Sequence, residues 1–377
     1  MNRFTALPLV NRFTPHRVKL WMFHTRKLFD LATPSRVRGR VYAETVPESQ
    51  RRTLQDIADA AGLSKAATSY ALRGLKGSEE TRARVLAIAA ELGYTADPIA
   101  RALANGRSDN VAIVGSLRDL WQQELTVMLS TALRGKELSS TIADVGASPK
   151  LERSMLSTLQ AQRVDGIVVL PVDPSADYWA SVPSDVRVVS LGDALTARPS
   201  SSCVMFDNEY GVGTALRHLA ELGHRSVAVL VSAQPTTPGR PAQLLAQSLG
   251  AALGLRVTVS SCSASVTGAA EVATRVLSSD PRPTALFCLS DSIAFGAYRA
   301  ARDLGLSIPG DVSILGFDDS ALASLVSPEL STFGWDEHAI VEAAVTALTS
   351  EDASPTSVMF RPEFMQRGST APPRAVR

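Results

Sequence analysis

The first residues in this chain whose types suggest chemistry lie between positions 65 and 73. Lys65 and Arg73 carry positive charges that can bind phosphate oxygens. Ser69 and Tyr70 carry hydroxyls that exchange hydrogen bonds with phosphates or base edges, and Ala66 offers a methyl group for apolar contact. If these five residues share one face of a helix, that face is suited to a nucleic-acid duplex.

Two short helices joined by a tight turn over residues 53–73 would place them on one face. Apolar residues of the first helix recur at i, i+3, i+4 and i+7, as Leu54, Ile57, Ala58 and Ala61. Gly62 ends this helix because glycine adopts left-handed backbone without steric cost, and Ser64 can cap the second. The inward face of the second helix comprises Thr68, Ala71 and Leu72. The pattern predicts a helix-turn-helix; the alternative is an ordinary helical hairpin with a solvated face.

Two further helical segments follow. Ser78 is expected to cap a third helix that ends at Gly93 and completes a small headpiece. The run from Asp97 to Gly106 has a helix start in Asp-Pro and a helix stop in Asn-Gly. Because isolated helices shorter than ~12–15 residues are marginal in water, this segment should form a helix only when something holds it.

Composition limits the classes of protein to consider. The 377 residues carry a net charge of +1, so affinity for nucleic acid must come from a local patch. Residues 1–51 are basic and aperiodic, which predicts a disordered extension or upstream sequence wrongly included. Basic residues interrupt any signal-peptide core, and no apolar run reaches membrane-spanning length. The scattered cysteines fit a reducing cytoplasm, and they are Cys203, Cys262 and Cys288.

From residue 109 to 377 short apolar runs alternate with helical segments. The strand candidates are 111–115, 165–170, 186–191, 226–231, 284–289 and 311–317. The helix candidates include 121–133, 211–222 and 292–304. Strands that are apolar on both faces and separated by helices predict parallel sheets covered on two sides. About 240 residues of this pattern suffice for two doubly wound α/β lobes, with a ligand at the carboxyl ends of the strands.

Catalytic and metal-binding patterns are missing from the sequence. The five histidines have no metal-ligand spacing, and His224 reads as a structural turn residue. There is no GxSxG elbow, no P-loop and no GxGxxG after a strand. We therefore expect no enzyme activity, no metal and no cofactor.

Long continuous motifs give the chain a resemblance to a known family. The run from Thr53 to Ser108, the stretch FDNEYGVGTALRHLAELGHRSVAVL, the stretch SDSIAFGAYRAARDLGLSIPGDVSILGFDD and the C-terminal RGSTAPP resemble the LacI/GalR family of bacterial transcription regulators. The resemblance covers residues from about 52 to the C-terminus. It implies a headpiece at 52–96, a hinge helix and linker at 97–108, and a two-lobed, periplasmic-binding-protein-like core at 109–377.

The resemblance also implies how DNA is bound. Homodimers would place two headpieces on a pseudo-palindromic operator, with hinge helices pushing Leu103 into the central minor-groove step. Family base readers fall on Lys65 and Ala66, whereas Tyr70 stands where arginine is common, which predicts an unusual half-site. Thr68 replaces a customary valine, and its hydroxyl can bond to the Ser64 carbonyl. The DNA-contacting residues are then Thr53, Leu54, Lys65, Ala66, Ser69, Tyr70, Arg73, Arg101 and Leu103.

The implied effector site departs from the family pattern. Carried across, its residues are Arg118, Trp121, Asp291, Asp318 and Trp335. Two polar anchors of the family have become Leu245 and Ser290, which suggests a less hydroxylated effector, a cationic one, or none. Structural roles remain alternatives: Asp291 as a helix cap, Asp318 as a turn residue and the tryptophans as core aromatics. Asp207 and Asn208 favour a capping role.

Three classes of function remain after the sequence has been read. The favoured one is a cytoplasmic, nucleoid-associated transcription regulator, more specifically a repressor, controlled by a small-molecule effector. The alternative is a solute-binding receptor module without DNA-binding function, which would leave the headpiece unexplained. An enzyme on the same lobes has only fold analogy behind it.

Overall fold

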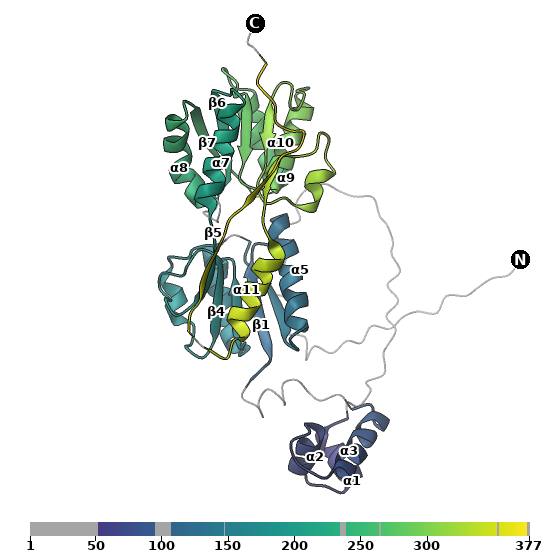
Figure 1. Cartoon of the computed structure of the whole chain (residues 1–377). Coiled ribbons are helices and arrows are strands. Elements are labelled where there is room, and N and C mark those ends of the chain that lie inside the picture. Colours follow the sequence, from purple (N-terminus) through teal and green to yellow (C-terminus); the bar gives the residue numbers. More distant parts are fainter. Residues whose placement is uncertain are drawn as a thin grey trace, which may run out of the picture. The chain divides into compact units, whose positions relative to one another are not determined.

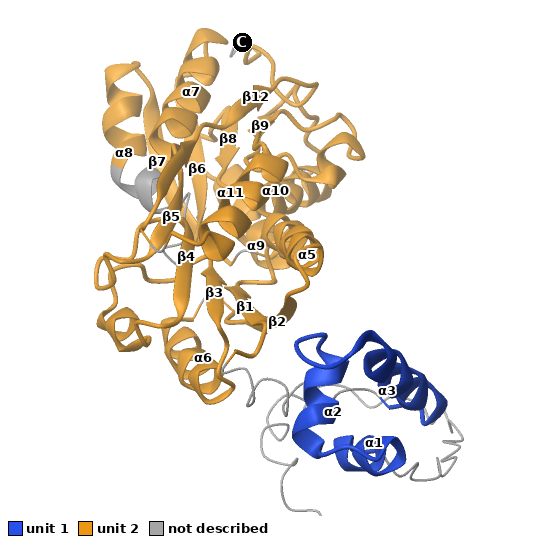
Figure 2. Cartoon of the chain, turned by 60° about the horizontal axis from the view of Figure 1, so that its bottom comes forward, with its two compact units in different colours: residues 1–94 blue, residues 95–377 orange. Residues whose placement is uncertain are grey.

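The structure is a computed structural model that describes residues 52–94, 107–146, 148–233, 239–263, 265–352 and 354–374. The chain divides into two compact units, residues 1–94 and 95–377 (Figure 2). The predicted N-terminal extension and the predicted hinge helix, including Arg101 and Leu103, lie outside the described residues.

The headpiece consists of three short helices, α1 (Leu54–Ala61), α2 (Lys65–Leu72) and α3 (Glu79–Glu91). Their buried side chains form one small core, which comprises Ile57, Ala61, Ala71, Val85 and Ala89. The predicted helix-turn-helix is therefore confirmed in the first unit of the chain, and α3 closes it.

Local chemistry explains the turn between α1 and α2. Gly62 has φ of 65°, the left-handed conformation that the sequence predicted. The Ser64 hydroxyl accepts a hydrogen bond from Ala67 N at 3.2 Å and so caps α2. The Thr68 hydroxyl donates to the Ser64 carbonyl at 3.1 Å, as predicted, and its side chain is buried. These contacts fix the orientation of α2 against α1.

The second unit contains two parallel sheets, one in each lobe. The first has the order β11-β5-β4-β3-β1-β2. Its strands are β1 (Asn110–Gly115), β2 (Ser139–Asp144), β3 (Gly166–Val169), β4 (Arg187–Gly192), β5 (Ser202–Phe206) and β11 (Ser357–Phe360). The second has the order β7-β6-β8-β9, with β6 (Ser226–Ser232), β7 (Arg256–Cys262), β8 (Ala285–Cys288) and β9 (Ser313–Leu315). A small antiparallel pair joins β10 (Thr332–Gly334) to β12 (Glu363–Met365).

Helices cover both faces of these sheets. They are α5 (Leu120–Arg134), α6 (Pro149–Ala161), α7 (Asn208–Glu221), α8 (Gly239–Ala252), α9 (Val266–Leu277), α10 (Asp291–Asp303) and α11 (Glu337–Thr349). Short 3-10 turns lie at Asp177–Ser181 and Ala321–Ser324. Figure 1 shows α11 beside α5 on one face of the first sheet, where both contribute to the same apolar core. The predicted two-lobed, doubly wound architecture is confirmed, and no described helix is long and apolar enough to span a membrane.

The chain passes between the lobes at three places within the described residues. It leaves the first sheet after β5, returns between β10 and α11, and leaves again between β11 and β12. Two of these crossings are tied together, because Arg361 Nε contacts Asp207 Oδ2 at 2.9 Å. Asp207 Oδ1 also accepts a hydrogen bond from Tyr210 N at 3.1 Å, which gives Asp207 the capping role favoured by the sequence.

Two glycines of α7 offer a matched test of the packing beside these crossings. A Cβ added at Gly211 would lie 2.8 Å from Phe317 Cζ and 2.9 Å from Pro362 Cγ, whereas one at Gly213 would meet nothing within 4 Å. We expect Gly211→Ala to lower the free energy of unfolding by about 1–3 kcal/mol through overpacking. Gly213→Ala should raise it by about 0.5–1 kcal/mol through helix propensity. Urea denaturation followed by far-UV circular dichroism measures both, and equal effects would contradict the described packing.

Candidate nucleic-acid interface and effector site

The residues predicted to contact DNA gather on the outward face of α2. Lys65, Ala66 and Arg73 are exposed, Tyr70 is 38% exposed, and Ser69 is half-buried. The opposite face buries Thr68 and Ala71 against α1 and α3. A rigid, capped helix thus presents basic, hydroxyl and methyl groups to solvent, which is the chemistry a major-groove reader needs.

Tyr70 is the centre of a small basic cluster. The Arg73 guanidinium lies 5.3 Å from the centroid of its ring, and Lys76 Nζ lies 5.4 Å from it. Both distances are within the range of cation–π attraction. Sequence reasoning missed Lys76, since it lies beyond the end of α2 and no helical spacing relates it to Tyr70. Two cations thus lie beside the ring of an exposed side chain of the headpiece.

Thr53 and Leu54 lie at the start of α1. Thr53 forms a capping box, in which Asp56 Oδ2 accepts hydrogen bonds from Thr53 N at 2.6 Å and from its hydroxyl at 3.0 Å. These hydrogen bonds lower the pKa of Asp56. Thr53 therefore has a structural role that the sequence did not indicate, and its contact with phosphate stays a prediction, as does that of the half-buried Leu54.

In the core, Asp291 has a third role that neither of its predicted readings describes. The cap of α10 is Ser290, whose hydroxyl accepts a hydrogen bond from Ile293 N at 3.3 Å, so the expectation of Asp291 as the cap was wrong. Asp291 is 1% exposed. Its oxygens accept hydrogen bonds from the Thr332 hydroxyl and from Ser320 N, both at 2.7 Å. It joins α10 to β10 and to the loop after β9, and burial raises its pKa to about 7.

Asp318 lies at the junction of the lobes, in the loop after β9. Its φ is 115°, a conformation that non-glycine residues rarely adopt, and its N–H donates to Phe333 O at 2.6 Å. Burial holds the pKa of Asp318 well above its usual range, and the charges of Asp119 and Asp291 add to this effect. The turn geometry supports its structural reading, while the buried carboxyl keeps it a candidate for ligand contact.

Two further acids lie at this junction: Asp119 falls within the loop 118–121 that the sequence indicated without being singled out there, and Glu337 was missed by sequence reasoning. Asp119 caps α5, because its Oδ1 accepts a hydrogen bond from Gln122 N at 3.1 Å, and burial raises its pKa. Burial and the charge of Glu124 raise the pKa of Glu337, in the first turn of α11, to about 7. The position of Asp119, at the carboxyl end of β1, was the available signal.

The two predicted tryptophans belong to an aromatic wall beside these acids. Trp121 meets Phe206 edge-on at 5.5 Å between ring centroids, and Phe206 lies 4.8 Å from Trp335. Trp335 also lies 5.9 Å from Phe317, so it packs on the cores of both lobes. This supports the core-aromatic reading of both tryptophans. Arg118, by contrast, is exposed.

The lobes touch directly beside the acids. Leu120 N, at the start of α5, donates a hydrogen bond to Ser292 Oγ of α10 at 3.3 Å. A cavity of about 300 Å³ opens next to this contact, and it is lined by Leu120, Gln123, Glu124, Val127, Ser320, Ala321 and Leu322. The predicted effector residues thus flank the cavity without lining it.

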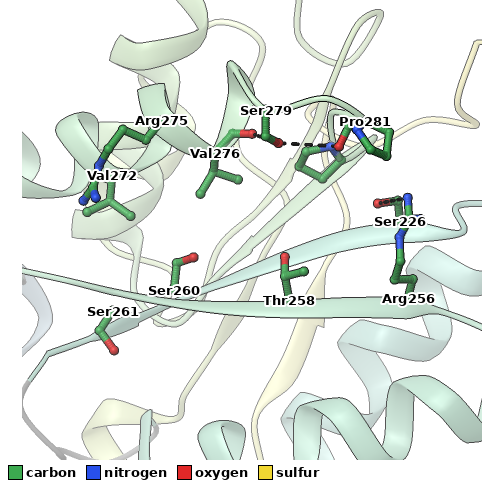
Figure 3. A pocket seen from close by; sticks show the side chains of 11 residues that line it. Ser226, Arg256, Thr258, Ser260, Ser261, Val272, Arg275, Val276, Ser279 and Pro281 are labelled. Atoms are coloured by element: carbon green, nitrogen blue, oxygen red, sulfur yellow. Dashed lines mark hydrogen bonds between the residues drawn. The ribbon is translucent and has the colours of Figure 1, made fainter.

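A larger cavity of about 630 Å³ lies in the lobe that contains the second sheet, between the edge strand β7 and α9 (Figure 3). Its lining includes Arg256, Thr258, Ser260 and Arg275. None of the predicted effector residues contributes to it, so it is separate from the lobe junction.

The remaining candidates for reactive chemistry have structural roles. His224 is buried, with Nδ1 2.8 Å from the Thr284 hydroxyl and Nε2 3.1 Å from the Ala371 carbonyl. All three cysteines are buried, and burial raises the pKa of the Cys288 thiol. Among the described residues no group of His, Cys, Asp and Glu could hold a metal ion.

Comparison with known proteins identifies the family. A model described as "Bacterial regulatory proteins, lacI family" matches residues 53–97, and one described as "Periplasmic binding protein-like domain" matches 216–370. An uncharacterized HTH-type transcriptional regulator in the aml 5' region of Streptomyces limosus is 34% identical over 344 residues, covering 84% of this chain and 94% of that protein. The chain therefore belongs to the lacI family. It is a DNA-binding transcription regulator, and members of this family are regulators rather than enzymes.

Solved structures share the fold. A lac repressor dimer bound to operator and an anti-inducer has a TM-score of 0.73 at 21% identity, covering 85% of this chain and 100% of that chain. A transcriptional regulator CelR-cellobiose complex has a TM-score of 0.61 at 24% identity, with the same coverage of 85% and 100%.

The acids of the lobe junction predict a pH dependence of stability. Asp291 has an ordinary pKa of 3.8 but about 7 in the folded core, so between these values the folded state holds a proton that the unfolded chain has released. The free energy of unfolding should therefore fall as pH rises from about 4 to about 7, and the raised pKa of Glu337 acts in the same direction.

The variant Asp291→Asn isolates the contribution of Asp291 to the change of the free energy of unfolding with pH. An amide at this position can still accept from Ser320 N and donate to the Thr332 hydroxyl, so most packing is kept. We expect a shallower loss of stability between about pH 5 and about pH 7 than in the wild type, measured by urea denaturation at each pH. Identical slopes in the two proteins would contradict the assignment.

Proposed function

We propose that this chain is a dimeric repressor that binds a pseudo-palindromic operator through α2 and changes its grip when a small molecule binds between the lobes. The observation that carries the proposal is the exposed face of α2, which presents Lys65, Tyr70 and Arg73 from a capped helix-turn-helix. Such a regulator acts in the cytoplasm, on the nucleoid. A solute receptor without DNA function has no use for this headpiece.

Each DNA contact follows from side-chain chemistry. Lys65 and Ala66, in the first turn of α2, approach base edges, with Ser69 and Tyr70 following one turn later. Tyr70 can exchange one hydrogen bond with a base or pack on a thymine methyl, whereas Arg73 and the N-terminus of α1 at Thr53 and Leu54 hold phosphates. Lys76 adds a phosphate contact beside Tyr70. In the segment that joins the headpiece to the core (residues 97–109, the connector), Arg101 binds the DNA backbone and Leu103 wedges into the central base-pair step.

The lobe junction supports an effector site. Asp119 and Asp318 come from different lobes and are both buried, and burial together with the charges of Asp119 and Glu337 raises the pKa of Asp318. Such a set can accept hydrogen bonds from hydroxyls or stabilise a cation, and Trp335 supplies an apolar face. A protein of the same fold is described as a cellobiose complex, which supports a sugar-sized ligand in this architecture. In this proposal the effector lies against Asp119, Asp318 and the half-buried Trp335, with Arg118 at the rim, while the buried Trp121 and Asp291 hold the site together.

Duplex binding tests the proposal. Fluorescence anisotropy with a labelled duplex from the region upstream of its own gene should show binding that resists random competitor and weakens steeply with salt. Tyr70→Ala should reduce the affinity about 10-fold, and Tyr70→Phe should separate the hydroxyl from the ring. Lys150→Ala, on an exposed turn of α6, is the matched control and should change nothing. Equal affinity of wild type and Tyr70→Ala would remove α2 from the interface.

The connector is tested separately. Leu103→Gly removes the proposed wedge, so the operator should bend less and bind at least about 10-fold more weakly. Gel mobility of circularly permuted duplexes reports bending, and anisotropy reports affinity. Unchanged bending together with unchanged affinity would exclude the wedge.

A further inference from the structure

The end of the connector (residues 97–109) is held by a single carboxylate of the core. Ser108 N donates a hydrogen bond to Asp165 Oδ1 at 3.1 Å, and Asp109 N donates to Asp165 Oδ2 at 2.7 Å. Each oxygen of Asp165 therefore receives one backbone N–H from the last residues before β1. Hydrogen bonds to a charged acceptor are about twice as strong as neutral ones.

The sheet brings Asp165 to this position. β1 and β3 are parallel neighbours, with Val111 paired to Gly166, so Asp165 lies at the amino end of β3 beside the amino end of β1. Asp165 N donates to the Asn110 carbonyl at 2.9 Å, which extends the ladder by one bond. With its backbone fixed by the strand pair, its side chain reaches past the end of β1 to the connector.

A turn at Asp109 sets the direction in which the chain leaves the core. Its φ is 51°, in the left-handed region that non-glycine residues enter at a cost. Its carbonyl accepts hydrogen bonds from Ser139 N at 2.8 Å and from the Ser139 hydroxyl at 2.9 Å. Ser139 of β2 thus holds the turn from one side, and Asp165 holds it from the other.

The same edge of the sheet is joined to the lobe junction by one helix. Arg187 N donates to the Asp165 carbonyl at 3.2 Å. The Arg187 guanidinium donates to the carbonyls of Leu348, at 3.2 Å, and Ser350, at the end of α11. The first residue of α11 is Glu337, one of the acids at the lobe junction. A helix of this length spans about 20 Å, so one helix connects the lobe junction to the amino edge of the sheet.

Solvent has access to this edge. Asp165, Arg107, Asp185 and Arg187 line a cavity of about 960 Å³ there. If the carboxylate were removed, water would compete for the amides of Ser108 and Asp109. The turn would then be held by Ser139 and by the hydrogen bond from Asn110 N to the Ser108 hydroxyl at 3.3 Å.

We propose that Asp165 is a positioning residue for DNA binding: by accepting the amides of Ser108 and Asp109 it fixes where the connector joins the core, and it couples this junction to α11. The inference rests on the proposed operator binding. If the connector is loosely attached to the core, the second headpiece of a dimer explores a wider space after the first has bound. The effective concentration of the second headpiece at its half-site is then lower. The carboxylate therefore contributes to operator affinity without touching DNA.

The test uses the full-length protein and three variants. Asp165→Ala removes both acceptors, Asp165→Asn keeps one, and Asp185→Asn changes a carboxylate in the same cavity that bonds to neither connector amide in the described residues. Amide hydrogen exchange is measured at Ser108 and Asp109. Affinity is measured with the duplex that the wild-type protein binds most tightly, and urea denaturation reports the stability of the core.

The expected order is graded. Asp165→Ala should exchange both amides faster and bind the duplex about 10-fold more weakly, Asp165→Asn should lie between it and wild type, and Asp185→Asn should match wild type. If Asp165→Ala fails to fold, Asp165→Asn carries the comparison. The inference about Asp165, but not the proposed function, is overturned by either of two results for Asp165→Ala. One is faster exchange of the Ser108 and Asp109 amides with unchanged duplex affinity, and the other is unchanged exchange. A wild-type protein that prefers no duplex overturns the proposed function and the inference together.

Discussion

Three backbone crossings constrain the core of this protein more than any other feature. They follow β5, precede α11 and follow β11, and the Asp207–Arg361 ion pair ties the first to the third. Lobes joined in this way stay connected, and in the proposed mechanism they move relative to each other by rotation about the crossings. The other functional features of the core are placed relative to these crossings. The acids lie at the lobe junction, and α11 runs from the junction toward the far edge of the first sheet. The connector ends at that edge.

The acids oppose the contact that the lobes make. Burial disfavours charge on Asp119 and on Asp318, and the charge of Asp119 adds to the raised pKa of Asp318. A ligand that neutralises or hydrogen-bonds these groups would favour the closed arrangement, and a few kcal/mol of differential binding suffices to shift such an equilibrium. In the proposed mechanism this is where an effector acts, and the Leu120–Ser292 hydrogen bond is the contact it strengthens or breaks.

The sequence predicted features that depend on local pattern. The headpiece helices follow from Gly62, Ser64 and Ser78, each of which acts within a few residues of itself. Apolar runs predicted the central strands β1, β3, β4, β6 and β8, because central parallel strands are buried on both faces, and they predicted the edge strand β9, whose three residues are also buried. The polar edge strand β2 gave no such signal, since only one residue of Ser139–Asp144 is buried. Strands β10 and β12 are three residues each, too short for a period to show.

The candidate site was harder to predict because its contacts are distant in the chain. The sequence offered Asp291 as an effector contact or as a helix cap, yet its hydrogen-bond partners Thr332 and Ser320 lie 41 and 29 residues away. The sequence indicated the loop 118–121 but did not single out Asp119, since Asp318, whose pKa its charge raises, belongs to the other lobe. Asp165 follows the same rule: its role depends on strand register, which the sequence alone does not fix. Residue types identified the family resemblance, but only the fold shows which carboxyls meet.

The central claim is that a headpiece held by this core reads a duplex as a symmetric pair of half-sites. The most direct measurement is selection of duplexes by the purified full-length protein from a random pool at moderate ionic strength, followed by sequencing. A dimeric reader should enrich one inverted repeat, with a half-site that lacks the guanine read by arginine at the base facing Tyr70. A pool that remains random after repeated rounds, or enrichment of a sequence without two-fold symmetry, would contradict it.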